Sequence, residues 1–136
     1  MTARELKVGR IKVKIPGGAS VLEERDLDEL YGASTGKPDA LIVLDCGGRI
    51  VAALIEDTGR PEPRDFERLS KAEDDLKGKG LLERNARVLR VLHHTGLKSA
   101  RVHLVRLARA YKVELQECRG KAADLEEILR RRGLFP

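Results

Sequence analysis

Two short apolar runs, residues 40–44 and 50–55, constrain the fold of this chain more than any other feature. Both are rich in Val, Ile and Leu, and the turn residues Cys46-Gly47-Gly48 lie between them. This pattern predicts two adjacent strands that pair antiparallel around the glycines. Because apolar residues occupy successive positions of each run, both faces of the sheet must be covered, and we expect helices to flank it.

Acidic residues stand at the open ends of this predicted hairpin, with Asp39 before the first strand and Glu56 and Asp57 at the end of the second. In a regular hairpin the start of one strand lies beside the end of its partner. Asp39 and Glu56 are therefore expected to approach each other, whereas Asp57 points to the other face. Two carboxylates with a nearby backbone carbonyl are a suitable oxygen ligand set for Mg²⁺. The alternative is that Asp39 caps a turn and that Glu56 and Asp57 end a strand in solvent.

Further elements are predicted on both sides of the hairpin. Alternation of apolar and basic side chains over residues 11–15 predicts a half-buried strand. Ser20 followed three residues later by Glu23 is the pattern of a capping box, which predicts a short helix that closes at Gly32. A longer helix is expected over residues 64–77, where apolar side chains recur at helical spacing.

The second half of the chain gives a less uniform pattern. Helical spacing over residues 82–93 predicts another helix. Alternation favours one strand over residues 102–106 and a second over residues 112–118, and one continuous helix over residues 104–115 is the alternative. Residues 125–129 begin a final helix, with acids early and arginines late, as the helix dipole favours. The whole chain is thus expected to be one α/β domain, with a mixed central sheet flanked by helices.

Charge is the clearest signal in the composition. The chain has 27 Lys and Arg residues against 22 Asp and Glu residues, for a net charge of +5. This excess favours a polyanionic partner, because phosphates are neutralised by Lys and Arg. Charged residues make up 36% of the chain, and Asn85 and Gln116 are its only side-chain amides. That composition is typical of proteins from very hot environments.

Location and metal content are also constrained by the sequence. We find no run long and apolar enough for a membrane span and no signal peptide, so we expect a cytoplasmic protein without a membrane partner. Cys46 and Cys118 are expected to be reduced packing residues. His93 and His94 are expected to pack rather than to chelate a metal, because adjacent residues of a helix point about 100° apart.

A sequence pattern around the hairpin carries a family resemblance. The dipeptide PD ending at Asp39, an apolar strand, a glycine turn, a second apolar strand and the tetrapeptide IEDT ending at Thr58 follow one another. This order resembles the PD-(D/E)xK nuclease superfamily, which includes archaeal Holliday junction resolvases and many restriction enzymes. The resemblance covers residues 37–76. It implies a restriction-endonuclease-like core, helix–strand–strand–strand–helix–strand. It also implies Mg²⁺ or Mn²⁺ held by catalytic Asp39 and Glu56, with the Asp57 carbonyl as a further metal ligand.

One position departs from the superfamily pattern. The superfamily has a lysine two residues after the second acid, and this chain has Thr58 there. A threonine hydroxyl cannot supply the cation that orients a hydroxide or stabilises a pentavalent phosphate. The helix expected after the hairpin carries Arg64, Arg68 and Lys71 along one stripe. Lys71 is our predicted catalytic substitute, because relatives carry a relocated cation on this helix, and Arg60 is the second candidate.

These features predict a nucleic-acid-binding protein of nuclease-like fold, which, if active, is a metal-dependent endonuclease. DNA is favoured over RNA, and a homodimer is expected by analogy with nucleases that act on two strands. The cations expected to contact the nucleic acid are Lys12, Lys14, Arg60, Arg64 and Arg68. The first alternative is a binding or assembly protein that has kept the fold and lost catalysis, which Thr58 favours. The second is a Rossmann-like regulatory domain, which needs the two apolar runs to be parallel strands.

Overall fold

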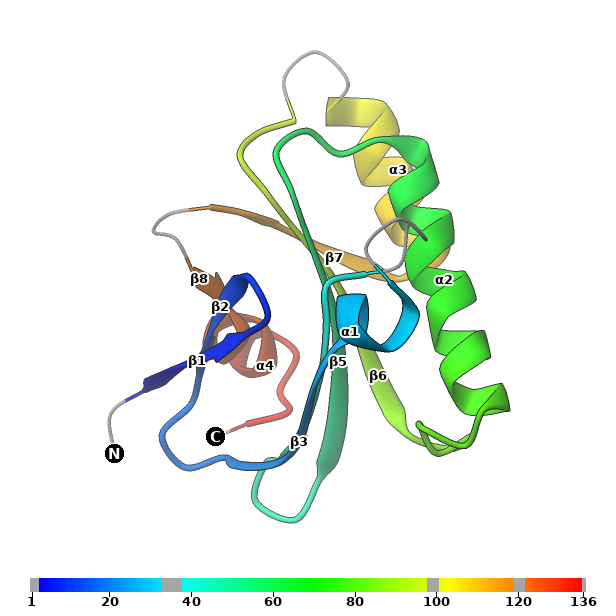
Figure 1. The fold of residues 1–136 in the computed structure, drawn as a ribbon. Coiled ribbons are helices and arrows are strands. Elements are labelled where there is room, and N and C mark those ends of the chain that lie inside the picture. The colour runs from blue at the N-terminus through cyan, green and yellow to red at the C-terminus, as the bar shows by residue number, and fades with distance from the viewer. Residues whose placement is uncertain (1–2, 33–37, 98–100, 119–121, 136) are drawn as a thin grey trace.

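The structure of the protein is a computed structural model that describes residues 3–32, 38–97, 101–118 and 122–135, so Lys37, where the superfamily resemblance begins, lies outside it. The strands of a three-stranded sheet are β1 (Arg4–Val8), β2 (Ile11–Ile15) and β8 (Ala122–Asp124). The strands of a five-stranded sheet are β3 (Ser20–Asp26), β4 (Ala40–Asp45), β5 (Ile50–Thr58), β6 (Arg87–His94) and β7 (Val113–Glu117). The helices are α1 (Leu27–Tyr31), α2 (Pro63–Gly78), α3 (Arg101–Tyr111) and α4 (Leu125–Arg131). The predicted mixed α/β class is confirmed (Figure 1).

The five-stranded sheet follows chain order, β3-β4-β5-β6-β7. Strand β4 is antiparallel to both of its neighbours, whereas β5, β6 and β7 are parallel to one another. The predicted antiparallel hairpin is confirmed, with Ala40 paired to Ile55 at its open end. Gly47 and Gly48 have φ values of 68° and 97°, which side-chain-bearing residues rarely adopt. Because β4 and β5 are antiparallel, the two apolar runs are not the parallel strands that the Rossmann-like alternative needed.

Both faces of the five-stranded sheet are covered, as the apolar runs predicted. On one face, α2 and α3 pack their buried side chains, including Phe66 and Leu104, against Leu54. On the other face, the three-stranded sheet and α4 pack side chains such as Val13 and Ile128 against the sheet. Figure 1 shows the sheet between these layers. The small sheet was not expected, and it brings β1 and β2 close to the candidate site described below.

The short helix predicted from Ser20 is mostly wrong. Residues 20–26 form the edge strand β3, which pairs with β4 and has a bulge between Val21 and Glu23. Only the end of the segment is helical, as α1, and its N-cap is Asp26, whose side chain accepts a hydrogen bond from the Asp28 amide. Backbone pairing with β4 satisfies the donors and acceptors of this segment. Tertiary context therefore overrides the local capping signal.

The helix predicted over residues 82–93 is also wrong, because residues 87–94 form strand β6. This strand lies between β5 and β7, so its backbone is paired on both sides. Leu89 and Val91 face one core cluster and Leu92 faces the other. A strand buried on both faces has a nearly continuous apolar sequence, and helical spacing appears within such a run by coincidence.

The segment after residue 100 combines features of the two predicted arrangements. The strand expected over residues 102–106 is wrong, because α3 occupies it, with Leu104 and Ala108 buried one turn apart. The alternative helix extends too far, since it ends at Tyr111 and Lys112 has a φ of 54°. The strand predicted near residues 112–118 is confirmed as β7. Parallel strands β6 and β7 need a crossover connection, which explains why a helix precedes β7.

The other predicted elements agree with the structure. Strand β2 and helices α2 and α4 lie where the sequence patterns placed them, with Leu69 of α2 and Leu129 of α4 fully buried. Within the described ranges, no helix is long and apolar enough to cross a membrane. The parallel strands β5, β6 and β7 end at one edge of the sheet, which we call the carboxyl edge, and its residues supply most of the candidate site.

Candidate active site

The two acids of the hairpin lie at the carboxyl edge. Asp39 directly precedes β4, and Glu56 belongs to the last part of β5. The Asp39 amide donates a hydrogen bond to the Ile55 carbonyl at 2.9 Å, which holds Asp39 beside the end of β5. The charge of Asp39 raises the pKa of Glu56, so the two carboxyl groups interact electrostatically across the hairpin. The structure thus brings together the two acids that are far apart in the sequence.

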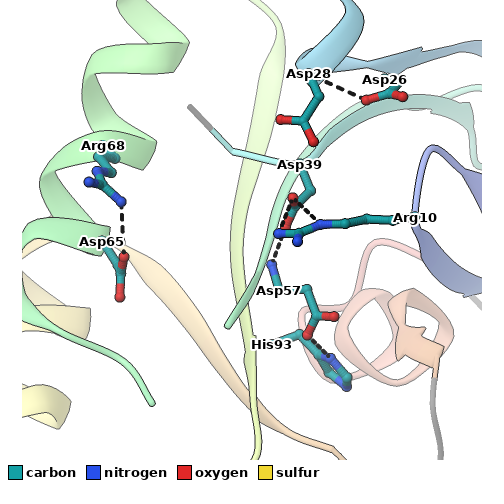
Figure 2. A network of polar contacts seen from close by, with 8 residues as sticks. All are labelled: Arg10, Asp26, Asp28, Asp39, Asp57, Asp65, Arg68 and His93. Carbon is teal, nitrogen blue, oxygen red and sulfur yellow. Dashed lines mark hydrogen bonds and ion pairs between the residues drawn. The ribbon is translucent and has the colours of Figure 1, made fainter. Parts of the chain in front are cut away.

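Asp39 is a buried carboxylate with both oxygens engaged. Only 5% of the residue is exposed. Its Oδ1 accepts hydrogen bonds from Arg10 Nε at 3.2 Å and Arg10 Nη2 at 3.0 Å. Its Oδ2 accepts one from the backbone amide of Asp57 at 2.7 Å (Figure 2). Burial raises the pKa of Asp39, and these donors act in the opposite direction because they favour the charged form.

Glu56 differs from Asp39 in its hydrogen bonding. Its Oε2 is buried and has no hydrogen-bond partner among the described residues. Burial is the largest cause that raises the pKa of Glu56 to about 8, and the negative charges of Asp39 and Asp65 add to it. Arg68 and Arg10 lower the pKa of Glu56 by smaller amounts. A buried carboxyl oxygen without a donor, next to other carboxylates, is a position where a cation would be stabilised.

The first turn of α2 supplies a third carboxylate and a cation. Asp65 is 4% exposed, and its Oδ2 accepts a hydrogen bond from the Glu62 amide at 2.7 Å, as part of a reciprocal capping box. Arg68 Nη1 lies 3.7 Å from Asp65 Oδ1 (Figure 2). The capping bond fixes Asp65 at the start of the helix. It therefore also fixes the part of α2 that acts electrostatically on Glu56.

Asp57 is turned away from Glu56, as strand alternation predicted. Its carboxylate Oδ1 lies 3.0 Å from His93 Nδ1 on the neighbouring strand β6, as Figure 2 shows. His93 is 3% exposed, whereas the side chain of Asp57 is 46% exposed. The predicted packing role of His93 is consistent with this burial, and its carboxylate partner was not foreseen. The Asp57 side chain is thereby directed to His93, and its backbone amide to Asp39.

The cations predicted on α2 form ion pairs with acids at the start of the helix or within it. Arg64 Nε lies 3.2 Å from Glu62. Lys71 Nζ lies 2.8 Å from Glu67, and the Lys71 side chain is 70% exposed. The charges that affect Lys71 are those of Glu67 and Tyr111 rather than those of Asp39 or Glu56. Lys71 is on the solvent side of α2, so the structure does not place it as the catalytic cation; on this helix Arg68 interacts with Glu56.

The remaining predicted cations lie outside the immediate site. Arg60 follows β5 and is exposed, and Lys12 is exposed on β2. Neither has an ion pair within the described ranges. Lys14 lies 3.8 Å from Asp124 and 3.6 Å from Glu126, so its charge is shared with the β8–α4 region.

Sequence inspection missed the cation that contacts Asp39. Arg10 lies in the turn between β1 and β2, which is a loop of the other sheet. A signal for this turn exists, because Gly9 separates two segments of alternating side chains. The alternation could have predicted a hairpin with Arg10 at its tip. It could not have predicted that the tip reaches Asp39, since that contact depends on how the two sheets pack.

A cavity lies at the edge of the sheet opposite the carboxyl edge. It has a volume of about 880 Å³ and is lined by apolar residues such as Leu22, Ile50 and Leu82, together with Arg49 and Glu83. Its lining lacks the close carboxylates of the carboxyl edge. The cavity and the cluster of acids therefore lie at opposite edges of the sheet. We place the candidate site at the carboxyl edge, because the carboxylates that can bind a cation lie there.

The donor set at the carboxyl edge fits a hard divalent cation with few protein ligands. No group of three or more His, Cys, Asp or Glu side chains is arranged to hold a metal ion in the described part of the chain. Asp39 and Glu56 offer carboxylate oxygens, and Mg²⁺ commonly keeps several waters and uses one or two carboxylates with substrate phosphate. The unpartnered Oε2 of Glu56 is the structural observation that favours such an ion.

Comparison with protein-family models, with curated proteins and with solved structures finds no match for this chain.

Proposed function

We propose that this protein binds nucleic acid at the carboxyl edge and hydrolyses phosphodiester bonds with Mg²⁺ or Mn²⁺ held by Asp39 and Glu56. The observation that carries the proposal is the buried, unpartnered Oε2 of Glu56 beside the negative charges of Asp39 and Asp65. Nothing in a purely structural role requires several acids to lie close together around an oxygen without a donor, because that arrangement destabilises the fold. A cation-binding role accounts for it.

The order of elements supports a restriction-endonuclease-like core. Three strands that are neighbours in the sheet, β3, β4 and β5, are followed by α2 and then by β6 parallel to β5, although the short helix α1 lies between β3 and β4 in the chain. This is the strand–strand–strand–helix–strand part of the arrangement that the sequence resemblance implies. The departure is at the start, where this chain has the β1–β2 hairpin before β3 within the described residues instead of a helix.

In the proposed reaction, the ion and the side chains of the protein have separate roles. When bound, a divalent ion would lower the pKa of a coordinated water and stabilise the leaving oxygen of the phosphodiester. Asp39 and Glu56 would hold the ion, with the Asp57 carbonyl as a further oxygen ligand. Arg10 and Arg68 supply positive charge beside the acids, where Thr58 supplies none. Their position favours binding of a phosphate group next to the ion.

The surface of α3 supports a polyanionic partner. This helix has no acidic residue, and Arg101, Arg106 and Arg109 are exposed. None of the three forms an ion pair with the described residues. A cleft of about 360 Å³ beside α3 is lined by Arg101 and Arg109, although Glu117 and Glu127 also line it. Helix α3 follows β6, so its first turn lies near the carboxyl edge. We therefore add these arginines to Arg60 and Lys12 as phosphate contacts.

A second candidate function is nucleic-acid binding without cleavage. It is favoured by two observations: Thr58 replaces the superfamily lysine, and both oxygens of Asp39 are already engaged by Arg10 and the Asp57 amide. In this case the site binds phosphates and has no reaction to perform. Glu56→Ala separates the two functions, because a nuclease loses cleavage whereas a binding protein keeps or gains affinity.

The test is a cleavage assay with Mn²⁺ on duplex, single-stranded and branched DNA and on RNA of the same sequence. We expect cleavage of at least one substrate, and loss of at least about 100-fold in Asp39→Asn and Glu56→Gln. Glu83→Gln, an exposed acid at the opposite edge, is the matched control and should cleave like the unmodified protein. Absence of cleavage on every substrate, with nucleic acid still bound, would leave the binding function in place of the nuclease.

A further inference from the structure

Arg10 is held at the candidate site by the shape of its turn. Gly9 has a φ of 60°, and a side chain built there would come within 2.7–2.9 Å of the Asp26 carboxylate. The tip of the β1–β2 hairpin thus lies directly against the N-cap of α1. This close approach carries Arg10 from the small sheet to Asp39, as Figure 2 shows.

The Arg10 guanidinium lies among carboxylates from three separate parts of the chain. Asp39, Asp28 and Asp57 all raise the pKa of Arg10, and Asp39 has the largest effect. Asp39 directly precedes β4, Asp28 lies in α1 and Asp57 lies in β5. A positive charge that several converging carboxylates surround is in the position that a bound cation would take.

Arg10 and a divalent cation cannot both use Asp39 in the arrangement seen. Two nitrogens of Arg10 contact Asp39 Oδ1, and the Asp57 amide contacts Oδ2. An ion coordinated by Oδ1 would displace the guanidinium or lie against its positive charge. The side chain of Arg10 is 70% exposed, whereas that of Asp39 is 5% exposed. Arg10 can therefore move away toward solvent, whereas Asp39 is fixed by the packing around it.

We propose that Arg10 couples the binding of nucleic acid to the binding of the divalent ion. In the free protein Arg10 occupies Asp39 Oδ1 and weakens metal binding. A phosphate of the nucleic acid draws the guanidinium off Asp39, because arginine binds phosphate through paired hydrogen bonds. Asp39 is then available to the ion. By linkage the ion also favours nucleic-acid binding, since it repels Arg10 toward the phosphate.

This inference rests on the proposed function, because it takes Asp39 and Glu56 as the ligands of the ion. It adds that the site is kept in a low-affinity condition until substrate arrives. A metal-dependent nuclease with this property would hold its ion firmly only when a phosphodiester is in place.

The experiment measures Mn²⁺ affinity of the full chain by titration calorimetry, with and without a short DNA duplex and the matching single strand. In the unmodified protein we expect nucleic acid to tighten Mn²⁺ binding by about 10-fold or more, within the usual range of coupling between sites. Arg10→Gln should bind Mn²⁺ about as tightly without nucleic acid as the unmodified protein does with it. Nucleic acid should then have little further effect.

Lys7→Gln is the matched control, because it removes one exposed positive charge from the same hairpin at a residue that does not contact Asp39. It should behave like the unmodified protein. Circular dichroism and thermal unfolding of Arg10→Gln verify that the exposed substitution leaves the fold intact. Arg10→Lys keeps the charge without the paired hydrogen bonds, and its Mn²⁺ affinity should be intermediate.

Two outcomes separate this inference from the proposed function. If Mn²⁺ binds and Asp39→Asn abolishes binding, but Arg10→Gln matches the unmodified protein with and without nucleic acid, the coupling role of Arg10 is wrong and the metal site stands. If Mn²⁺ binds none of the proteins under any condition, the metal site itself is wrong, and the coupling is lost with it.

Discussion

Asp39 and Glu56 are neighbours at one edge of the sheet, yet their surroundings differ in a way that indicates what the site does. Asp39 receives three hydrogen bonds, from Arg10 and from the Asp57 amide. Glu56 has a buried oxygen that receives none, and burial with nearby negative charge raises its pKa to about 8. At Asp39 the hydrogen-bond donors favour the anion and oppose the effect of burial, which still raises its pKa. At Glu56, the described residues provide no hydrogen-bond donor for the buried Oε2.

This contrast indicates that the protein supplies hydrogen-bond donors for Asp39 but not for the buried oxygen of Glu56. A fold that needed both acids for stability would have given donors to both, because an unsatisfied buried carboxyl is costly. The two acids should therefore respond in opposite directions when each is replaced, and this difference can be measured without a nucleic-acid substrate.

The largest expected effect is on stability at Asp39. Asp39→Ala removes a buried acceptor and leaves the Asp57 amide without its partner, so we expect a loss of about 2–4 kcal/mol in the free energy of unfolding. Urea unfolding at pH 7 in the absence of divalent ions measures it. A loss below about 0.5 kcal/mol, the level of an ordinary surface substitution, would show that the engagement of Asp39 contributes little.

The next effect is the pH dependence at Glu56. A carboxyl whose pKa is raised to about 8 in the folded protein, from an ordinary value near 4.5, stays protonated while the unfolded chain loses its proton. The stability of the unmodified protein should therefore fall between about pH 4.5 and pH 8. Glu56→Gln removes this loss, so its advantage in stability should be near zero at pH 4.5 and of order 1–3 kcal/mol at pH 8.

Thermal and urea unfolding of the two proteins across this pH range provide the measurement. Glu83→Gln is again the control, because Glu83 is exposed and its replacement should leave the pH profile unchanged. If Glu56→Gln gave the same stability difference at both ends of the range, the raised pKa and the buried, unpartnered state of Glu56 would both be in error.

Charge reversal extends the comparison from two acids to two helices. The exposed cations of α2 lie beside acids, as Arg64 does with Glu62, whereas Arg106 and Arg109 of α3 have no acidic partner in the described ranges. Arg106→Glu with Arg109→Glu should weaken nucleic-acid binding by about 10-fold or more and reduce its salt dependence. Arg64→Glu should have a smaller effect. Equal weakening by changes on both helices would contradict the assignment of α3 as a phosphate-binding surface.

The smallest effect is expected at Lys71. Its ammonium pairs with Glu67 on the exposed side of α2, and the site acids do not act on it. Lys71→Ala should change cleavage less than about 2-fold, because exposed pairs of this kind contribute little. A loss comparable to that of Glu56→Gln in the same assay would restore Lys71 as the catalytic cation.

The parts of the fold that were predictable are those where local pattern and tertiary environment agree. The β4–β5 hairpin combines continuous apolar runs with a glycine turn, and α2 combines helical spacing with prolines at its start, so both were predicted correctly. Strand β6 has the spacing of a helix and is a strand because it lies between two others. Its assignment depended on neighbours that the sequence does not identify.

The candidate site could likewise be predicted only in part from the sequence. The approach of Asp39 and Glu56 follows from the pairing of adjacent strands, so it could be predicted from the sequence. The contact of Arg10 with Asp39 follows from the packing of one sheet on the other, and the sequence holds no short-range signal of it. The role of Lys71 was predicted from its spacing on a helix. Spacing gave its position along α2 and did not show that it faces solvent.

Titration of the unmodified protein and Glu56→Gln with Mn²⁺ at pH 7, in the absence of nucleic acid, tests the metal site most directly. We predict saturable binding of about one ion per chain in the unmodified protein, with release of a proton as the ion replaces it on Glu56, and no such binding in Glu56→Gln. Equal Mn²⁺ binding by both proteins, or binding by neither, would contradict the assignment of Glu56 and Asp39 as a divalent cation site.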